Sequence, residues 1–172
     1  YPRGAAAGEY VPRNVSDLKE IEIGKAEELI EIETDMDLTI LTVGSTVLPA
    51  QKAAEVLNNN GYKTAVVDAR FIKPLDEEII IKALKNSKNI ITAEEQVLAG
   101  GFSSAVLELA ADRGVAINKI KRIGIGDEFV THGGMDQMKK EYQLDARGIL
   151  ENALSLLSKA EEVNELWPEK KD

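Results

Sequence analysis

The strongest constraint on the fold of this chain is an alternation of short apolar runs with stretches of helical periodicity, which begins at Asp37. The apolar runs occupy residues 38–43, 64–68, 89–93 and 119–123, and helical periods fill the intervals between them. Strands that alternate with helices build parallel sheets whose faces are covered by those helices. The pattern therefore predicts an α/β fold: a three-layer domain with a mostly parallel sheet of four to five strands and helices on both faces.

Helix start and stop signals agree with this alternation. Pro49 stands where the first helix should begin, and Gly61 follows its end as an expected left-handed cap. Asp76 and Asp145 precede two further apolar-periodic stretches, where a carboxylate can accept from the open N–H groups of a helix start. We expect the core to contain Leu41, Val43, Val66, Ile90, Ile91 and Leu109.

The chain divides into three parts. Residues 1–20 show no apolar period and carry four turn-forming residues typical of a linker, Pro2, Gly4, Gly8 and Pro12. Residues 21–160 hold the predicted α/β domain, and residues 161–172 form a charged tail. Apolar residues alternate with glutamate over 21–32, which predicts an edge hairpin around Gly24-Lys25. The opening residues read like the interior of a longer protein, so we expect a fragment.

Composition narrows the range of functions. The chain carries 21 Lys+Arg against 30 Asp+Glu, a net charge of −9, which argues against nucleic acid as a partner because such binding relies on Lys and Arg. With no Cys and one His, disulfides, thiolate zinc sites and His-cluster metal sites are excluded, and no metal is expected. No apolar run approaches the roughly 20 residues of a membrane span, and the first residues lack the pattern of a signal peptide. We therefore expect a cytoplasmic protein without a membrane partner.

Three loops at the predicted carboxyl ends of the strands are candidate sites, because ligands of open α/β sheets gather there. The first loop, Gly44-Ser45-Thr46, joins a strand to a helix start. Its backbone N–H groups and two hydroxyls could hold an anion. Ser45 or Thr46 could equally cap the helix without any ligand. Both interpretations stay open at this point.

The second loop runs from Glu94-Glu95 to Gly100-Gly101. A phosphate there would lie beside two carboxylates, which weakens binding. Paired carboxylates can do acid–base work, but successive residues of a strand point to opposite faces, so Glu94 and Glu95 need not face each other. We therefore favour a structural role, in which a glutamate accepts backbone N–H groups and the glycines let another chain approach closely.

The third loop, Gly124-Ile125-Gly126, begins like a dinucleotide-binding fingerprint but has Phe129 at the position of the third glycine. His132 is the only histidine, the residue type that most often serves as a base near neutral pH. No activated nucleophile can be named beside it, and a lone loop histidine is more typical of an interface or a cap. The sequence therefore offers no catalytic residue.

Several motifs together resemble one enzyme family. They are Tyr1-Pro2-Arg3-Gly4, Arg70-Phe71-Ile72-Lys73-Pro74-Leu75-Asp76, Glu94-Glu95 with Gly100-Gly101, Ile125-Gly126-Asp127-Glu128-Phe129 before His132-Gly133, and Leu144-Asp145-Ala146-Arg147-Gly148-Ile149. In this order they resemble the C-terminal (third) domain of the 1-deoxy-D-xylulose-5-phosphate synthases, thiamine-diphosphate enzymes of the transketolase superfamily. The resemblance covers residues 1–157.

This resemblance implies a transferase that condenses pyruvate with glyceraldehyde 3-phosphate, with loss of carbon dioxide, at the start of isoprenoid precursor synthesis. It implies that the chain is the structural and dimer-forming third domain of a homodimer, with the N-terminal domains of the same polypeptide as partners. Thiamine diphosphate and magnesium would be bound by those domains, because this chain lacks the family's Gly-Asp-Gly motif and its cofactor-activating glutamate. We therefore expect the chain alone to bind neither and to be inactive.

The resemblance also gives roles to two groups of residues. Arg3 is the candidate for contact with the substrate phosphate, since a guanidinium binds phosphate through a bidentate fork. Gly100, Gly101 and Phe102 are the candidate dimer contact, because small residues let a backbone approach and an aromatic residue can anchor an interface.

Two alternatives remain. The C-terminal domains of transketolases and of pyruvate dehydrogenase beta subunits share the Glu-Glu and Gly-Gly pattern. A regulatory module that binds an anionic ligand at Gly44-Ser45-Thr46 is the alternative from a different class.

Overall fold

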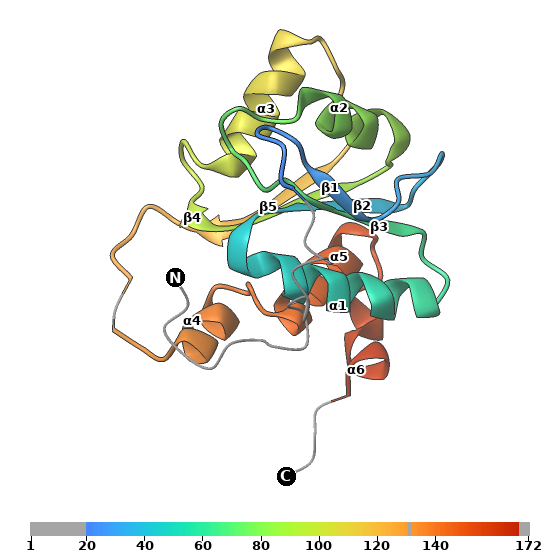
Figure 1. The fold of residues 1–172 in the computed structure, drawn as a ribbon. Helices are drawn as coiled ribbons and strands as arrows, with labels where there is room; N and C mark the ends of the chain where they lie inside the picture. Colours follow the sequence, from blue (N-terminus) through green and yellow to red (C-terminus); the bar gives the residue numbers. More distant parts are fainter. Residues whose placement is uncertain (1–19, 131, 169–172) are drawn as a thin grey trace.

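The computed structural model describes residues 20–130 and 132–168, and a single five-stranded sheet runs through its centre (Figure 1). In spatial order the strands are β1 (Glu27–Ile30), β3 (Thr64–Asp68), β2 (Leu38–Thr42), β4 (Ile90–Val97) and β5 (Ile120–Ile125). Strands β2 to β5 are parallel, whereas β1 pairs with β3 in the antiparallel direction. The predicted mostly parallel sheet of four to five strands is confirmed.

Helices cover both faces of the sheet, as predicted (Figure 1). On one face lie α2 (Glu77–Asn86) and α3 (Phe102–Asp112); on the other lie α1 (Val47–Asn59) and α5 (Ala146–Leu156), with α4 (Met135–Glu141) and α6 (Val163–Leu166) on the same side. A hydrophobic core lies on each face of the sheet. Strand β2 contributes side chains to both cores, because successive strand residues point to opposite faces. Its Leu38 and Ile40 pack with α1 and α5, and its Leu41 packs with α2 and α3.

The predicted core residues are largely confirmed. Five of them are buried: Leu41, Val66, Ile90, Ile91 and Leu109. Val43 is only half-buried, because it follows the last residue of β2 and packs at the margin of the core between β2, α2 and α3.

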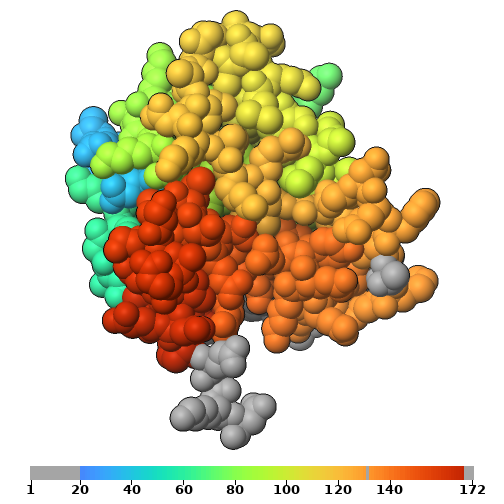
Figure 2. Space-filling view, turned by 180° about the vertical axis from the view of Figure 1, so that it is seen from behind, coloured from blue at the N-terminus to red at the C-terminus, as the bar shows by residue number. Residues whose placement is uncertain are grey.

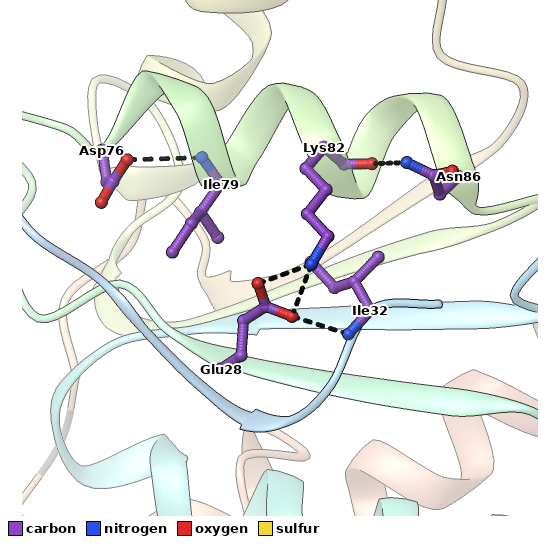
Figure 3. A network of polar contacts seen from close by, with 6 residues as sticks. All are labelled: Glu28, Ile32, Asp76, Ile79, Lys82 and Asn86. Atoms are coloured by element: carbon purple, nitrogen blue, oxygen red, sulfur yellow. Dashed lines mark hydrogen bonds and ion pairs between the residues drawn. The ribbon is translucent and has the colours of Figure 1, made fainter. Parts of the chain in front are cut away.

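The predicted hairpin over residues 21–32 is wrong. Only β1 forms there, and its partner is β3, with Glu27 opposite Asp68. A two-stranded hairpin is marginal on its own, whereas joining an existing sheet buries one face of the strand. The carboxylate of Glu28 holds this edge strand to α2: it accepts from the Ile32 N–H at 2.7 Å and from Lys82 Nζ at 2.8 Å (Figure 3).

The predicted helix caps are present. The Asp76 carboxylate accepts from the Ile79 N–H at 3.3 Å at the start of α2 (Figure 3), and also from the Ala26 N–H at 3.1 Å. The Asp145 carboxylate accepts from the Gly148 N–H at 2.9 Å at the start of α5. Gly61 ends α1 with a φ of +88°. Asp76 therefore does more than cap, since it also fixes the chain just before β1.

The described part of the predicted charged tail is attached to the body of the domain. Residues 160–162 form a 3-10 turn, η4 (Ala160–Glu162), which leads into α6, and Leu166 and Trp167 pack against the core between the sheet, α1 and α5. The Tyr62 hydroxyl donates to Glu162, and this bond raises the pKa of Tyr62 and lowers the pKa of Glu162. In the described part of the chain, no helix is long and apolar enough to cross a membrane.

Candidate functional site

The sheet has a topological switch point between β2 and β4. From β2 the chain passes through α1 to β3 on one side, and it later returns to place β4 on the other side. The helices that follow these two strands, α1 and α3, lie on opposite faces of the sheet (Figure 1). Open α/β sheets bind ligands at such a point. The structure brings the first two candidate loops together here.

The first loop forms a 3-10 turn, η3 (Gly44–Thr46), before α1. The Thr46 hydroxyl is fully buried and lies 2.9 Å from the carbonyl oxygens of Val43 and Ala93, to either of which it can donate. It therefore ties the end of β2 to β4, and neither it nor Ser45 caps α1. The Ser45 hydroxyl donates to the carboxylate of Glu95. Both hydroxyls proposed for an anion are thus engaged within the chain, and the anion site stays a prediction.

Glu95 forms the polar centre of the switch point. Besides the contact with Ser45, its carboxylate lies 3.8 Å from Lys139 Nζ on α4. A cavity of about 170 Å³ opens beside it, lined mostly by apolar side chains: Ile125, Met135, Met138, Tyr142 and Leu144, with Glu95 and Lys139. Burial and the neighbouring carboxylates of Glu128 and Glu141 raise the pKa of Tyr142, so its phenol is neutral at physiological pH. An anion would meet a carboxylate here.

Of the two glutamates for which a structural role was predicted, Glu94 is the one that accepts backbone N–H groups. Its carboxylate is fully buried and accepts from the N–H groups of Phe102 at 2.6 Å and Ser103 at 2.8 Å. These are two of the open donors at the start of α3, where the helix dipole favours a negative charge. The protein therefore supplies the anion of this helix N-terminus from its own strand β4, and the position a phosphate would take is filled.

The glycines before α3 serve this contact. A Cβ on Gly101 would lie 2.3 Å from a carboxylate oxygen of Glu94 and 2.5 Å from the Val97 carbonyl oxygen. The close approach is thus made by the same chain. Phe102 has no exposed surface and packs in the core with α2, so the expectation that it is a surface anchor is wrong. The hydrophobicity of an aromatic residue does not predict whether its side chain lies in the core of its own domain or at an interface. A dimer contact at Gly100, Gly101 and Phe102 stays a prediction, but it loses its main physical argument because Phe102 is not available at the surface.

Arg122 also contributes to the turn between β4 and α3, and we did not expect this role from the sequence. Its half-buried guanidinium donates to the Ser103 hydroxyl at 2.8 Å and to the Leu98 carbonyl oxygen. It therefore clamps the turn between β4 and α3. The available signal was the alternation in β5, where Lys121 and Arg122 are neighbours and point to opposite faces, so that one of the two cations must be partly buried and needs hydrogen-bond partners.

The motif from Arg70 to Asp76 has a structural role in the described chain. Arg70 adopts a left-handed φ of +54°, its N–H donates to Asp68 at 2.9 Å, and its guanidinium pairs with Glu27 of β1. Burial raises the pKa of Asp68. Together with the Asp76 contacts, these interactions lock β1 against β3 and α2.

The remaining candidates are not drawn into this site. Arg3 lies outside the described residues. His132 is exposed in the segment before α4, and Phe129 is fully exposed. Within residues 20–130 and 132–168, no three His, Asp or Glu side chains are placed to hold a metal ion. The switch point therefore does not fit a magnesium-bound diphosphate, since the Glu94 carboxylate occupies the start of α3 and the Glu95 carboxylate contacts Ser45 just before α1.

The fold and the arrangement of residues at the switch point are those of one class of α/β domain. The sequence profile of the family described as transketolase, C-terminal domain, matches residues 24–149. The chain belongs to this family.

Curated proteins that are similar to the chain include several 1-deoxy-D-xylulose-5-phosphate synthases. The chain is 47% identical over 149 residues to synthase 1 of Geobacter sulfurreducens, covering 87% of the chain and 22% of the relative. It is 41% identical over 170 residues to the synthase of Halothermothrix orenii, covering 99% of the chain and 26% of the relative. The chain thus spans about a quarter of the length of these relatives.

Solved structures agree on the fold. A structure described as "Split gene transketolase, inactive beta4 tetramer" matches with a TM-score of 0.72 and 27% identity, covering 83% of this chain and 45% of that one. A transketolase from Pichia stipitis matches with a TM-score of 0.55 and 20% identity, covering 78% of this chain and 18% of that one, which supports the fold alone.

Proposed function

We propose that this chain is the C-terminal domain of a 1-deoxy-D-xylulose-5-phosphate synthase. The complete enzyme would condense pyruvate with glyceraldehyde 3-phosphate, release carbon dioxide and begin isoprenoid precursor synthesis in the cytoplasm. The observation that carries the proposal is the 47% and 41% identity to synthases over nearly the whole chain, which is higher than the 27% identity to the split-gene transketolase.

In this proposal the chain has a structural role. Three of its buried polar side chains hold strands and helices together: Glu94 caps α3, Thr46 joins β2 to β4, and Asp76 joins α2 to the segment before β1. Thiamine diphosphate and magnesium would be bound by the N-terminal domains of the same polypeptide, within a homodimer. Arg3, ahead of the described residues, would contact the triose phosphate.

The test compares the chain with a polypeptide that carries it as its C-terminal part. The longer polypeptide, with thiamine diphosphate and magnesium, should form 1-deoxy-D-xylulose 5-phosphate and one carbon dioxide per pyruvate. The 172-residue chain alone should form none and should give no heat with thiamine diphosphate in calorimetry. Arg3→Lys in the longer polypeptide should raise the KM for glyceraldehyde 3-phosphate more than it lowers kcat.

The same assay separates the alternatives. Transfer of a two-carbon unit from a ketose phosphate without release of carbon dioxide would identify a transketolase instead. Oxidative decarboxylation of pyruvate with acetyl transfer would identify a pyruvate dehydrogenase beta-type subunit. Saturable binding of a sugar phosphate to the chain alone, lost in Ser45→Ala, would favour the regulatory module.

A further inference from the structure

The turn between α1 and β3 contains an asparagine followed by a glycine, a pair that can react without any enzyme. Helix α1 ends at Asn59, and Asn60 and Gly61 follow it before β3 begins at Thr64. The backbone nitrogen of a glycine can reach the side-chain carbonyl carbon of a preceding asparagine, because glycine has no side chain to hinder the approach. No other asparagine of the sequence precedes a glycine.

This turn is open to solvent. Asn60 and Gly61 are both exposed, and a Cβ placed on Gly61 would meet no atom within 4 Å. The turn lies at the margin of the molecule, at the far end of α1 from η3 (Figure 1). In the space-filling view the teal atoms of this part of the chain form the left edge of the molecule (Figure 2). Water and hydroxide can therefore reach both residues in the folded domain.

Hydrogen bonds hold the reacting atoms of the turn in place. The Asn60 amide nitrogen Nδ2 donates to the Val56 carbonyl oxygen at 2.8 Å, and the Gly61 N–H donates to the Asn58 carbonyl oxygen at 3.1 Å. Attack requires the Gly61 nitrogen to lose its proton and turn toward Cγ of Asn60, so both bonds must first break. They lie at the end of α1, and helix ends open more readily than helix interiors.

A second pair of bonds limits this opening. The side chain of Asn58 donates to the Thr64 carbonyl oxygen and accepts from the Thr64 N–H, both at 2.9 Å. We call these two bonds the Asn58–Thr64 clamp. The clamp joins the last turn of α1 to the first residue of β3, so it spans Asn60 and Gly61 and keeps the turn closed.

We propose that Asn60 is a site of spontaneous deamidation, and that opening of the end of α1 sets its rate. The deprotonated backbone nitrogen of Gly61 forms a bond to Cγ of Asn60, and the side-chain nitrogen leaves as ammonia, which gives a cyclic succinimide. Water then adds to one of the two ring carbonyl carbons and opens the ring to aspartate or isoaspartate. One water is consumed, one ammonia is released, and nothing is oxidised or reduced.

The products weaken the junction between α1 and β3. A carboxylate at position 60 cannot donate to the Val56 carbonyl oxygen, and it places a negative charge at the end of a helix where the dipole is also negative. Isoaspartate in addition lengthens the backbone by one carbon atom inside the segment that the Asn58–Thr64 clamp spans. The reacted domain should therefore unfold at a lower temperature than the fresh one.

Peptide mapping by mass spectrometry tests the proposal on the 172-residue chain kept at mildly alkaline pH. Asn60 should exchange its amide for an acid at least tenfold faster than Asn59, which is also exposed but precedes an asparagine. Unfolding the chain in urea should speed the reaction at Asn60. In Asn60→Gln the thermal midpoint should not fall during the same incubation, because the longer side chain forms a ring far more slowly.

Two matched variants test the role of the helix end. Asn58→Ser removes the Asn58–Thr64 clamp and should speed the reaction at Asn60 several-fold. Asn86→Ser is the control: Asn86 also ends a helix and donates to the Lys82 carbonyl oxygen at 2.8 Å, but it belongs to α2 on the other face of the sheet. It should leave the rate at Asn60 unchanged.

Equal reaction at Asn59 and Asn60, or none at Asn60, would overturn the deamidation site. Equal rates in the folded and the urea-unfolded chain would overturn the protection by the hydrogen bonds of the turn. Equal acceleration by Asn58→Ser and Asn86→Ser would show that the whole domain must unfold first, which would overturn the local opening of α1.

Discussion

Helices α3 and α4 follow neighbouring strands of the sheet, and each begins directly after two glycines, yet they are held very differently. At the start of α3, Glu94 from β4 accepts two helix N–H groups, and Phe102 lies fully buried. At the start of α4, Gly134 provides no side-chain cap, and no residue of the helix is buried. The same glycine signal thus precedes both an anchored helix and an exposed one.

The difference comes from the preceding strand. β4 continues to Val97 and places a carboxylate opposite the first turn of α3, whereas β5 ends at Ile125 and is followed by a longer segment before α4. A helix start that receives a partner from a rigid strand is fixed in position. A helix start without one depends on the contacts of its side chains, and those of α4 are largely exposed.

The largest expected difference is between the two phenylalanines. Phe102→Ala should lower the free energy of unfolding by about 3–5 kcal/mol, because it removes a fully buried aromatic side chain from the core. Phe129→Ala should change it by less than about 0.5 kcal/mol, because that side chain makes no buried contact. Urea unfolding of the 172-residue chain measures both, and similar losses would contradict the contrast.

The next effect concerns the neighbouring glutamates. Glu94→Gln should cost about 1.5–3 kcal/mol, since the amide NH₂ would face a helix N–H where a carboxylate oxygen now accepts. Glu95→Gln should cost at most about 1 kcal/mol, because its partners Ser45 and Lys139 lie at the solvent edge. The two variants differ by one position and carry the same charge change. If Glu95→Gln unfolds at the lower urea concentration, the capping role of Glu94 is wrong.

A smaller effect is expected at the glycines. Gly101→Ala should cost about 1–3 kcal/mol, because its Cβ would overlap the Glu94 carboxylate and the Val97 carbonyl oxygen. Gly134→Ala has open space around the added Cβ and should change stability by less than about 0.5 kcal/mol. Thermal denaturation of both variants provides the comparison. If Gly101→Ala is as stable as the wild-type chain, the turn between β4 and α3 can rearrange to admit the added Cβ, and the predicted overlap is wrong.

The smallest effect is expected at the end of α4, where burial raises the pKa of Tyr142. A phenol with a raised pKa in the folded state stabilises that state below its unfolded pKa of about 10 and loses this contribution as pH rises through the folded value. The wild-type chain should therefore lose stability relative to Tyr142→Phe above about pH 10. Stability measured against pH for both proteins, with phenolate absorbance to follow ionisation, checks the sign. An unchanged difference between pH 8 and 11 would rule out the shift.

The sequence predicted those parts of the molecule that local patterns decide. The β-branched runs gave β2 and β3 nearly to the residue, and Asp76, Asp145 and a glutamate of the Glu94-Glu95 pair were expected to accept backbone N–H groups. Each of these follows from the chemistry of a residue and its near neighbours. The prediction failed where a choice depends on distant parts of the chain. Thr46 bonds to Ala93 of another strand, and β1 pairs with β3 and not with residues 21–23.

The contrast between Phe102 and Phe129 shows the same limit. Both are aromatic residues beside glycine-containing turns, and hydrophobicity alone ranks them equally. Which one is buried is set by the helix packed over it: α3 lies against α2, whereas no described element covers Phe129. The anion and dimer roles assigned to loop residues stay predictions for the same reason, since they depend on partners that lie beyond one chain.

The position of α5 has a consequence for how the protein is made. This helix comes late in the chain, but Ile149, Leu150, Ala153 and Leu154 complete the core over β2 and α1. During synthesis, which adds roughly 5–20 residues per second, the apolar face of α1 stays uncovered until residues 146–156 have left the ribosome. A nascent chain that stops before Ala146 would therefore expose a large apolar surface, which makes such products substrates for chaperones and proteases.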